Sequence, residues 1–131
     1  MIRAGITHEG KMKVENEVTA ESMGSGTLPV FATPAMILLI ERTATECLMP
    51  LLNEGESTVG THLEIRHSAP SLVGSEIYCR VKLAEADRLK LVFDVKVWDS
   101  AGEVGFGRHE RFLVDEATFM ERAASRTQGE K

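Results

Sequence analysis

Residues 33–50 have the sequence TPAMILLIERTATECLMP, and this stretch decides what the rest of the chain must build. Thr33 is a favourable N-cap, Pro34 stands where proline is tolerated at the first helical position, and Pro50 marks the other limit. We therefore expect a helix of about four to five turns. The apolar run 35–40 covers every direction around the axis, which predicts a helix buried on most sides.

Composition limits the classes of protein to consider. With 131 residues, of which 43% are hydrophobic, the chain is expected to form one globular domain, 1–131, with a polar tail at about 125–131. A net charge of -5 provides no basic footprint for nucleic acid or an anionic membrane, so neither partner is expected. A CoA-type substrate would need a local basic patch.

Cysteine and histidine usage indicates a reducing cytoplasm and no metal site. Cys47 and Cys79 have no CxxC spacing, and the first residues lack the apolar segment of a signal peptide. The four histidines form no HExxH motif and no Cys/His cluster, so we expect neither a metal nor another cofactor. The predicted helix is too short and too charged to cross a bilayer.

Alternation of polar and apolar residues predicts one strand before the helix and four after it. The expected strands are 11–19, 58–69, 75–84, 88–98 and 103–114, with a loop at 20–29 and a short helix at 116–124 capped by Asp115. These patterns predict an α+β fold, an antiparallel sheet with one dry face curled around the long helix. Such a sheet leaves edges uncovered, so we expect a homodimer.

Several passages resemble a known family over about residues 11–119. They are VFATPAM at 30–36, Glu41, GESTVGT at 55–61, RHSA at 66–69 and GRHER at 107–111. Together with the element order, they resemble the fluoroacetyl-CoA thioesterase-like branch of the hotdog superfamily. The resemblance implies a hotdog fold, thioester hydrolysis, a catalytic set of Thr33, Glu41 and His67, and an active-site glycine at Gly60. The fluoroacetyl-specific enzyme has an aromatic-bearing lid before the helix. Residues 21–29 contain no aromatic here, so fluoroacetyl selectivity is not expected.

The helix residues of this set have structural alternatives. Thr33 could simply start the helix, or its hydroxyl could act where free amides favour an oxyanion. Since Pro34 has no N–H, the helix could offer only the amides of Ala35 and Met36 to substrate. Glu41 could pair with Arg42 or another basic residue, or serve as a general base. Thr33 and Glu41 are about 12 Å apart along the axis, so a third group or the substrate must lie between them.

The strand residues are weighed in the same way. Counting by twos along the strand puts 59, 61, 63, 65 and His67 on the helix side, where a histidine is either a core residue or the third group. Gly60 could mark a bulge or a close approach to an acyl group. His109 and Arg111 share a face of the last strand; they could bind substrate, including the phosphate or adenine groups of CoA, or form ordinary surface ion pairs.

The function expected from these residues is hydrolysis of a small or medium acyl-CoA thioester to the free acid and CoA, by a Thr/Glu/His set in a homodimer. CoA enters only as part of the substrate. The alternative is a non-catalytic module that binds acyl-CoA or another small ligand on the same fold. Hydration of an enoyl thioester is a third option.

Overall fold

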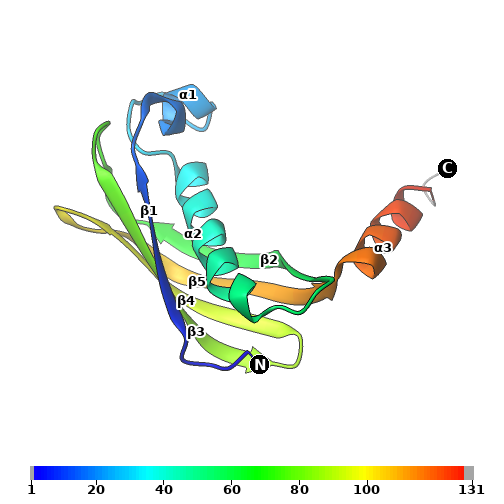
Figure 1. Ribbon diagram of the computed structural model, residues 1–131. Coiled ribbons are helices and arrows are strands. Elements are labelled where there is room, and N and C mark those ends of the chain that lie inside the picture. The colour runs from blue at the N-terminus through cyan, green and yellow to red at the C-terminus, as the bar shows by residue number, and fades with distance from the viewer. Residues whose placement is uncertain (1, 129–131) are drawn as a thin grey trace.

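The structure is a computed structural model that describes residues 2–128 (Figure 1). The strands are β1 (Thr7–Lys13), β2 (Glu56–His67), β3 (Glu76–Asp87), β4 (Lys90–Asp99) and β5 (Gly102–Asp115). The helices are α1 (Ala20–Met23), α2 (Thr33–Leu48) and α3 (Glu116–Gln128), with two 3₁₀ turns, η1 (Asn16–Val18) and η2 (Met49–Leu51). All strand pairs are antiparallel, in the order β1-β3-β4-β5-β2, so the predicted α+β class is confirmed.

The core lies between α2 and one face of the curved sheet, while α3 projects from the end of β5 (Figure 1). Side chains on alternate positions of β3 and β4 meet the buried side of α2, as the period-two pattern predicts. The fully buried contacts include Met36, Leu39, Ile40, Leu48, Ile77, Cys79, Val81, Leu83, Phe93 and Val104.

Residues 2–128 leave the opposite side of α2 uncovered, contrary to the expectation of a helix buried on most sides. Leu38 is 52% exposed, and Pro34 and Arg42 are exposed as well. The sheet has one layer and can cover only one side of a helix, so the remaining apolar positions of the run face outward. Beside this helix face, β2 forms an edge of the sheet, and its residues 60–64 are exposed.

The N-terminal segment differs from the expected strand and loop. The strand ends at Lys13, and Asn16 begins a 3₁₀ turn whose carbonyl accepts a hydrogen bond from the Thr19 hydroxyl at 2.8 Å. The same hydroxyl accepts from the amide of Ser22 at 3.3 Å and so caps α1, which ends at Gly24 with φ 76°. A 3₁₀ turn and a short helix therefore occupy residues for which a strand end and a loop were predicted. The Thr19 side chain stabilises both of them by hydrogen bonds to the nearby backbone.

The C-terminal helix begins as predicted but continues further. The Asp115 carboxylate accepts from the amide and the hydroxyl of Thr118, at 3.0 and 2.9 Å. The helix extends to Gln128 instead of about 124, so the first part of the expected tail is helical. Residues 129–131 of that tail lie outside the described residues.

A bulge in β2 changes which residues face the helix. The register with β5 shifts between Gly60 and His62, so Thr58 and Gly60 share the inward face with Ile65 and His67. Counting by twos placed Val59 on the helix side, which was wrong, because Val59 pairs with Phe112 on the outward face. The extra residue, Thr61, restores the alternation needed to bring Gly60 and His67 to the same side.

Candidate active site

Thr33 is the first residue of α2 and contacts His67 instead of capping the helix. The N-cap is Ala32, which has no side-chain cap, so the expectation that Thr33 is the N-cap was wrong. The Thr33 hydroxyl and His67 Nδ1 form a hydrogen bond of 2.8 Å. Since the helix does not use this hydroxyl, it is available for chemistry at the helix N-terminus, where free amides and the dipole favour negative charge.

His67 ends β2 and is only partly satisfied. Its ring packs edge-on against Phe31, with the ring centroids 6.2 Å apart. Burial lowers the pKa of His67, and the nearby backbone of Ala69 partly opposes that shift. Nevertheless, Nε2 is buried and makes no hydrogen bond within residues 2–128. A cavity of about 290 Å³ opens beside Thr33 and His67.

Glu41 belongs to a second polar cluster and pairs with Arg111, not with the neighbouring Arg42 considered from sequence. Its Oε2 lies 3.5 Å from Arg111 Nη1. Arg111 also donates from Nε to the Thr58 hydroxyl at 2.9 Å and from Nη2 to the Thr58 carbonyl at 3.1 Å. Three bonds from a rigid guanidinium fix its position, so Arg111 holds the Glu41 carboxylate in place.

His109 supports this arrangement from beneath. The ring is fully buried; Nδ1 lies 3.0 Å from the His62 carbonyl, and Nε2 lies 3.2 Å from Arg111 Nη1. A carbonyl can only accept and a guanidinium can only donate, so the neutral ring with its proton on Nδ1 satisfies both contacts. Burial lowers the pKa of His109, as does the charge of Arg111. His109 and Arg111, for which the sequence suggested substrate binding or surface ion pairs, are therefore both buried next to Glu41.

These buried histidines make thermal stability depend on pH. Their folded-state pKa values are lower than the ordinary 6.5, so the unfolded chain binds protons that the folded chain does not. Stability is therefore complete above the unfolded pKa and falls as the pH drops through about 6.5. Around His109, Glu41 and Glu110 oppose the effect of Arg111. We expect a lower Tm at about pH 5.5 than at about pH 7.5; equal values would contradict the neutral assignment.

Gly60 is required by the Glu41 cluster. A Cβ at this position would overlap Glu41 Oε2 and would lie 3.2 Å from both Arg111 Nη1 and His109 Cε1. The sequence suggested either a bulge at Gly60 or a close approach of its backbone to an acyl group. The bulge lies next to it, at Thr61, and the group that lies close to Gly60 is the Glu41 carboxylate. Thr58, which the sequence analysis missed, lies two residues earlier on the same face.

Substituting Gly60 by alanine separates activity from stability. The nearest obstacle to the new Cβ is the flexible end of Glu41, so the carboxylate is displaced while the backbone is not. We expect kcat/KM to fall at least about 10-fold and the Tm to change by no more than a few degrees. A hydrolysis assay and a thermal melt of the same preparation test this. Unchanged activity would show that Glu41 need not lie over Gly60.

The chain does not bring the three predicted catalytic residues together. Glu41 lies over Gly60, about 12 Å from Thr33 along α2. Gly60 and His67 are separated by about 20 Å along β2. The predicted oxyanion donors differ as well: Ala35 and Met36 are fully buried, and the Met36 amide donates to the Ala32 carbonyl at 3.1 Å. The Ala35 amide is left as the donor from the first turn.

Among the described residues, no helix is long and apolar enough to cross a membrane, and no three His, Cys, Asp or Glu side chains form a group that could hold a metal ion.

Comparison with known proteins agrees with this architecture. The family model described as fluoroacetyl-CoA-specific thioesterase matches residues 14–117. The fluoroacetyl-CoA thioesterase of Streptantibioticus cattleyicolor is 29% identical over 98 residues, which cover 75% of this chain and 70% of that protein. A solved structure of the fluoroacetyl-CoA thioesterase FlK superimposes with a TM-score of 0.89 at 24% identity, covering 95% of this chain and 97% of that one.

A thioesterase superfamily member from Thermus thermophilus has a TM-score of 0.87 at 25% identity, covering 99% of this chain and 98% of that one. These matches confirm the predicted hotdog fold and the predicted enzyme class, thioester hydrolase. Because the family model matches most of this chain, residues 14–117, the chain belongs to the fluoroacetyl-CoA-specific thioesterase family.

Proposed function

We propose that this protein hydrolyses small or medium acyl-CoA thioesters as a homodimer, and that each active site combines Thr33 and His67 of one copy with Glu41 of the other. The observation that carries this proposal is the buried Nε2 of His67, which lacks a partner within residues 2–128 while Nδ1 is bonded to Thr33. A buried polar atom needs a partner, and a carboxylate from a second copy would supply one.

The uncovered surfaces of the chain support such a dimer. The exposed face of α2 and the free edge of β2 lie beside each other, and both are features that a second copy can cover. A two-fold axis at Glu64 would pair the inward-facing Leu63 with Ile65 of the second copy. Because Thr61 is the extra residue of the bulge, His67 would then lie opposite Gly60 of the second copy, with Glu41 above it.

In this arrangement each side chain has a chemical role. The Thr33 hydroxyl donates to His67 Nδ1, and the Glu41 carboxylate accepts from His67 Nε2 or from a water molecule. In one route water attacks the thioester carbonyl while Glu41 takes its proton; the C–S bond then breaks, and the leaving CoA thiolate receives that proton. In the other route the Thr33 hydroxyl or the Glu41 carboxylate attacks the carbonyl and the C–S bond breaks, which releases CoA and leaves an acyl-enzyme that water then cleaves to the free acid. The amides of Ala35 and Gly60 are the candidates to hold the oxyanion. An acyl adduct detected by mass spectrometry in a single turnover would identify the second route.

The cavity beside Thr33 and His67 supports the proposed range of acyl groups. At about 290 Å³ it is small, and its lining includes Val30, Phe31 and Pro70. Thiol release from a panel of acyl-CoAs, fluoroacetyl-CoA included, tests the proposal. We expect short and medium chains to be hydrolysed. If no member releases CoA while an acyl-CoA still raises the Tm, the protein is a binding module instead. A change in enoyl absorbance without thiol release would indicate a hydratase.

Mixing two inactive variants tests whether the site is shared. In a dimer of one Glu41→Gln chain and one His67→Asn chain, one site carries both substitutions and the other carries neither. After denaturation and refolding of an equal mixture, we expect activity to return to roughly a quarter of the wild-type value, because half of the dimers are mixed and each has one complete site. Each variant refolded alone is the control. No recovery in a mixture shown to contain mixed dimers would place the whole site within one chain.

A further inference from the structure

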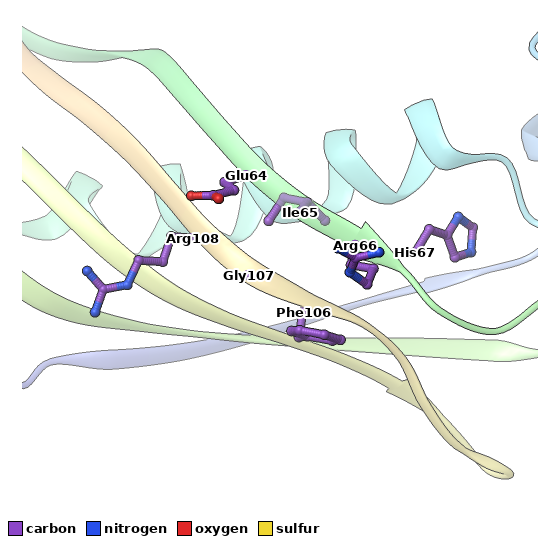
Figure 2. Close-up of a pocket in the computed structure, with 7 residues that line it drawn as sticks. All are labelled: Glu64, Ile65, Arg66, His67, Phe106, Gly107 and Arg108. Atoms are coloured by element: carbon purple, nitrogen blue, oxygen red, sulfur yellow. The ribbon is translucent and has the colours of Figure 1, made fainter.

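The outward face of the sheet carries a row of side chains that the proposed reaction does not use. Arg66 on β2 and Lys96 on β4 are both paired with Phe106 on β5. Directly paired residues in an antiparallel sheet place their side chains next to each other on one face. Phe106 is 40% exposed, and Figure 2 shows its ring beside Arg66. The row therefore presents an aromatic ring between two cations.

Two other cations of the same face are already paired with carboxylates. Arg108 is paired with Asp94 at 3.0 Å, and Arg80 lies 4.0 Å from Glu9. Within residues 2–128, neither Arg66 nor Lys96 has an acidic side chain within 4.0 Å. The chain as a whole has a net charge of -5, so this row is a local exception to its overall charge. Among the described residues, Lys82 on the same face has no such partner either, so the feature that sets Arg66 and Lys96 apart is the exposed ring of Phe106 between them. Two cations beside an exposed aromatic ring fit an anionic ligand that also carries a planar ring.

A cavity connects this row with the catalytic histidine. It has a volume of about 610 Å³ (Figure 2). Its lining includes two cations, Arg66 and Arg108, one acid, Glu64, the ring of Phe106, and His67 from the end of β2. His67 also lines the smaller cavity at Thr33. A long ligand could therefore pass around the end of β2, with one end at the row and the other at Thr33. Pairing of two β2 edges extends the sheet and leaves its outward face open.

We propose that the row Arg66, Phe106 and Lys96 binds the phosphorylated adenosine end of CoA. Arg66 and Lys96 contact the phosphate groups, and the adenine stacks on Phe106. The inference rests on the proposed acyl-CoA substrate. The row Arg66, Phe106 and Lys96 supplies the local basic patch that an acyl-CoA substrate needs on an acidic protein. His109 and Arg111, which the sequence suggested for CoA, are buried on the other face.

A truncated substrate isolates this contact. The double variant R66Q/K96Q is assayed with an acyl-CoA and with the same acyl group on N-acetylcysteamine, which lacks the nucleotide. We expect KM for the acyl-CoA to rise about 10-fold with kcat changed less than about 2-fold, and no change for the truncated thioester. Phe106→Ala should raise KM for the CoA ester in the same selective way. Lys82→Gln, on the same outward face, is the control and should change neither substrate.

The outcomes separate this inference from the proposed function. An unchanged KM for the CoA ester would overturn the row as a CoA site, and so would an equal rise for both substrates. If the wild type hydrolyses no thioester, calorimetric titration with CoA itself decides. Binding that is weakened about 10-fold in R66Q/K96Q but not in K82Q would support the row even though the hydrolase proposal had failed. Absence of CoA binding, or binding equal in all three proteins, would overturn it.

Discussion

Replacement of Glu41 by glutamine is expected to lower kcat/KM for the best acyl-CoA substrate at least about 100-fold, the magnitude that loss of a general base produces. Glutamine keeps the size of the side chain but can neither take a proton nor attack a carbonyl. The Glu41 side chain is 40% exposed, and glutamine can still accept a hydrogen bond from Arg111 through its amide oxygen, so the fold should be retained. Some stability should be lost, because the buried Arg111 loses its negative partner. Thiol-release kinetics and a thermal melt of the purified variant measure both quantities.

Glu46→Gln is the matched control for this experiment. Glu46 is an exposed acid on the same helix, and its described partner is His8, at 3.3 Å. We expect Glu46→Gln to retain nearly wild-type activity. If the two substitutions had similar effects, the loss at position 41 would reflect a change of overall charge, and Glu41 would have no catalytic role.

Gly107→Ala is expected to have the largest effect on folding. Gly107 has φ 150°, a conformation that favours glycine, and a Cβ there would overlap the backbone carbonyl of Glu64 on the neighbouring strand. A backbone group cannot move aside as a side chain can, so β2 and β5 would have to separate. We expect the free energy of unfolding to fall by about 3 kcal/mol or more, measured by denaturant titration.

Gly102 provides the comparison that isolates the steric overlap. It lies on the same strand with φ 133°, and a Cβ there would meet nothing within 4 Å. Gly102→Ala therefore carries only the backbone strain, on the order of 1 kcal/mol. Equal losses at the two positions would mean that strain alone matters and that the close approach of β2 to β5 at Gly107 is unimportant.

Much of this fold could be predicted from local signals in the sequence. Thr33-Pro34 and Pro50 gave the limits of α2, because proline acts through the backbone and its effect does not depend on distant residues. Alternation gave the four strands after the helix to within three residues at each end. Asp115 gave the start of α3, since its cap involves a residue only three positions away.

The features that were missed depend on residues far apart in the sequence. No periodicity reveals that Arg111 contacts Glu41 and Thr58, or that His109 is buried beneath them. The run 35–40 predicted burial on most sides because a sequence pattern does not show which side of a helix a single-layer sheet leaves exposed. The distance between Glu41 and His67 could not be predicted either, because it depends on how both α2 and β2 run through space.

The bulge at Thr61 has a consequence for protein design. A designer who copied Thr33, Glu41 and His67 onto another sheet-and-helix scaffold with a regular strand would reproduce the three side chains and lose the site. On a regular strand Gly60 and His67 are seven positions apart and point to opposite faces. The transferable unit is therefore the whole segment from Thr58 to His67 with its extra residue. Flattening the bulge without removing a residue would turn one half of the site to the other face, while every proposed catalytic side chain was still present.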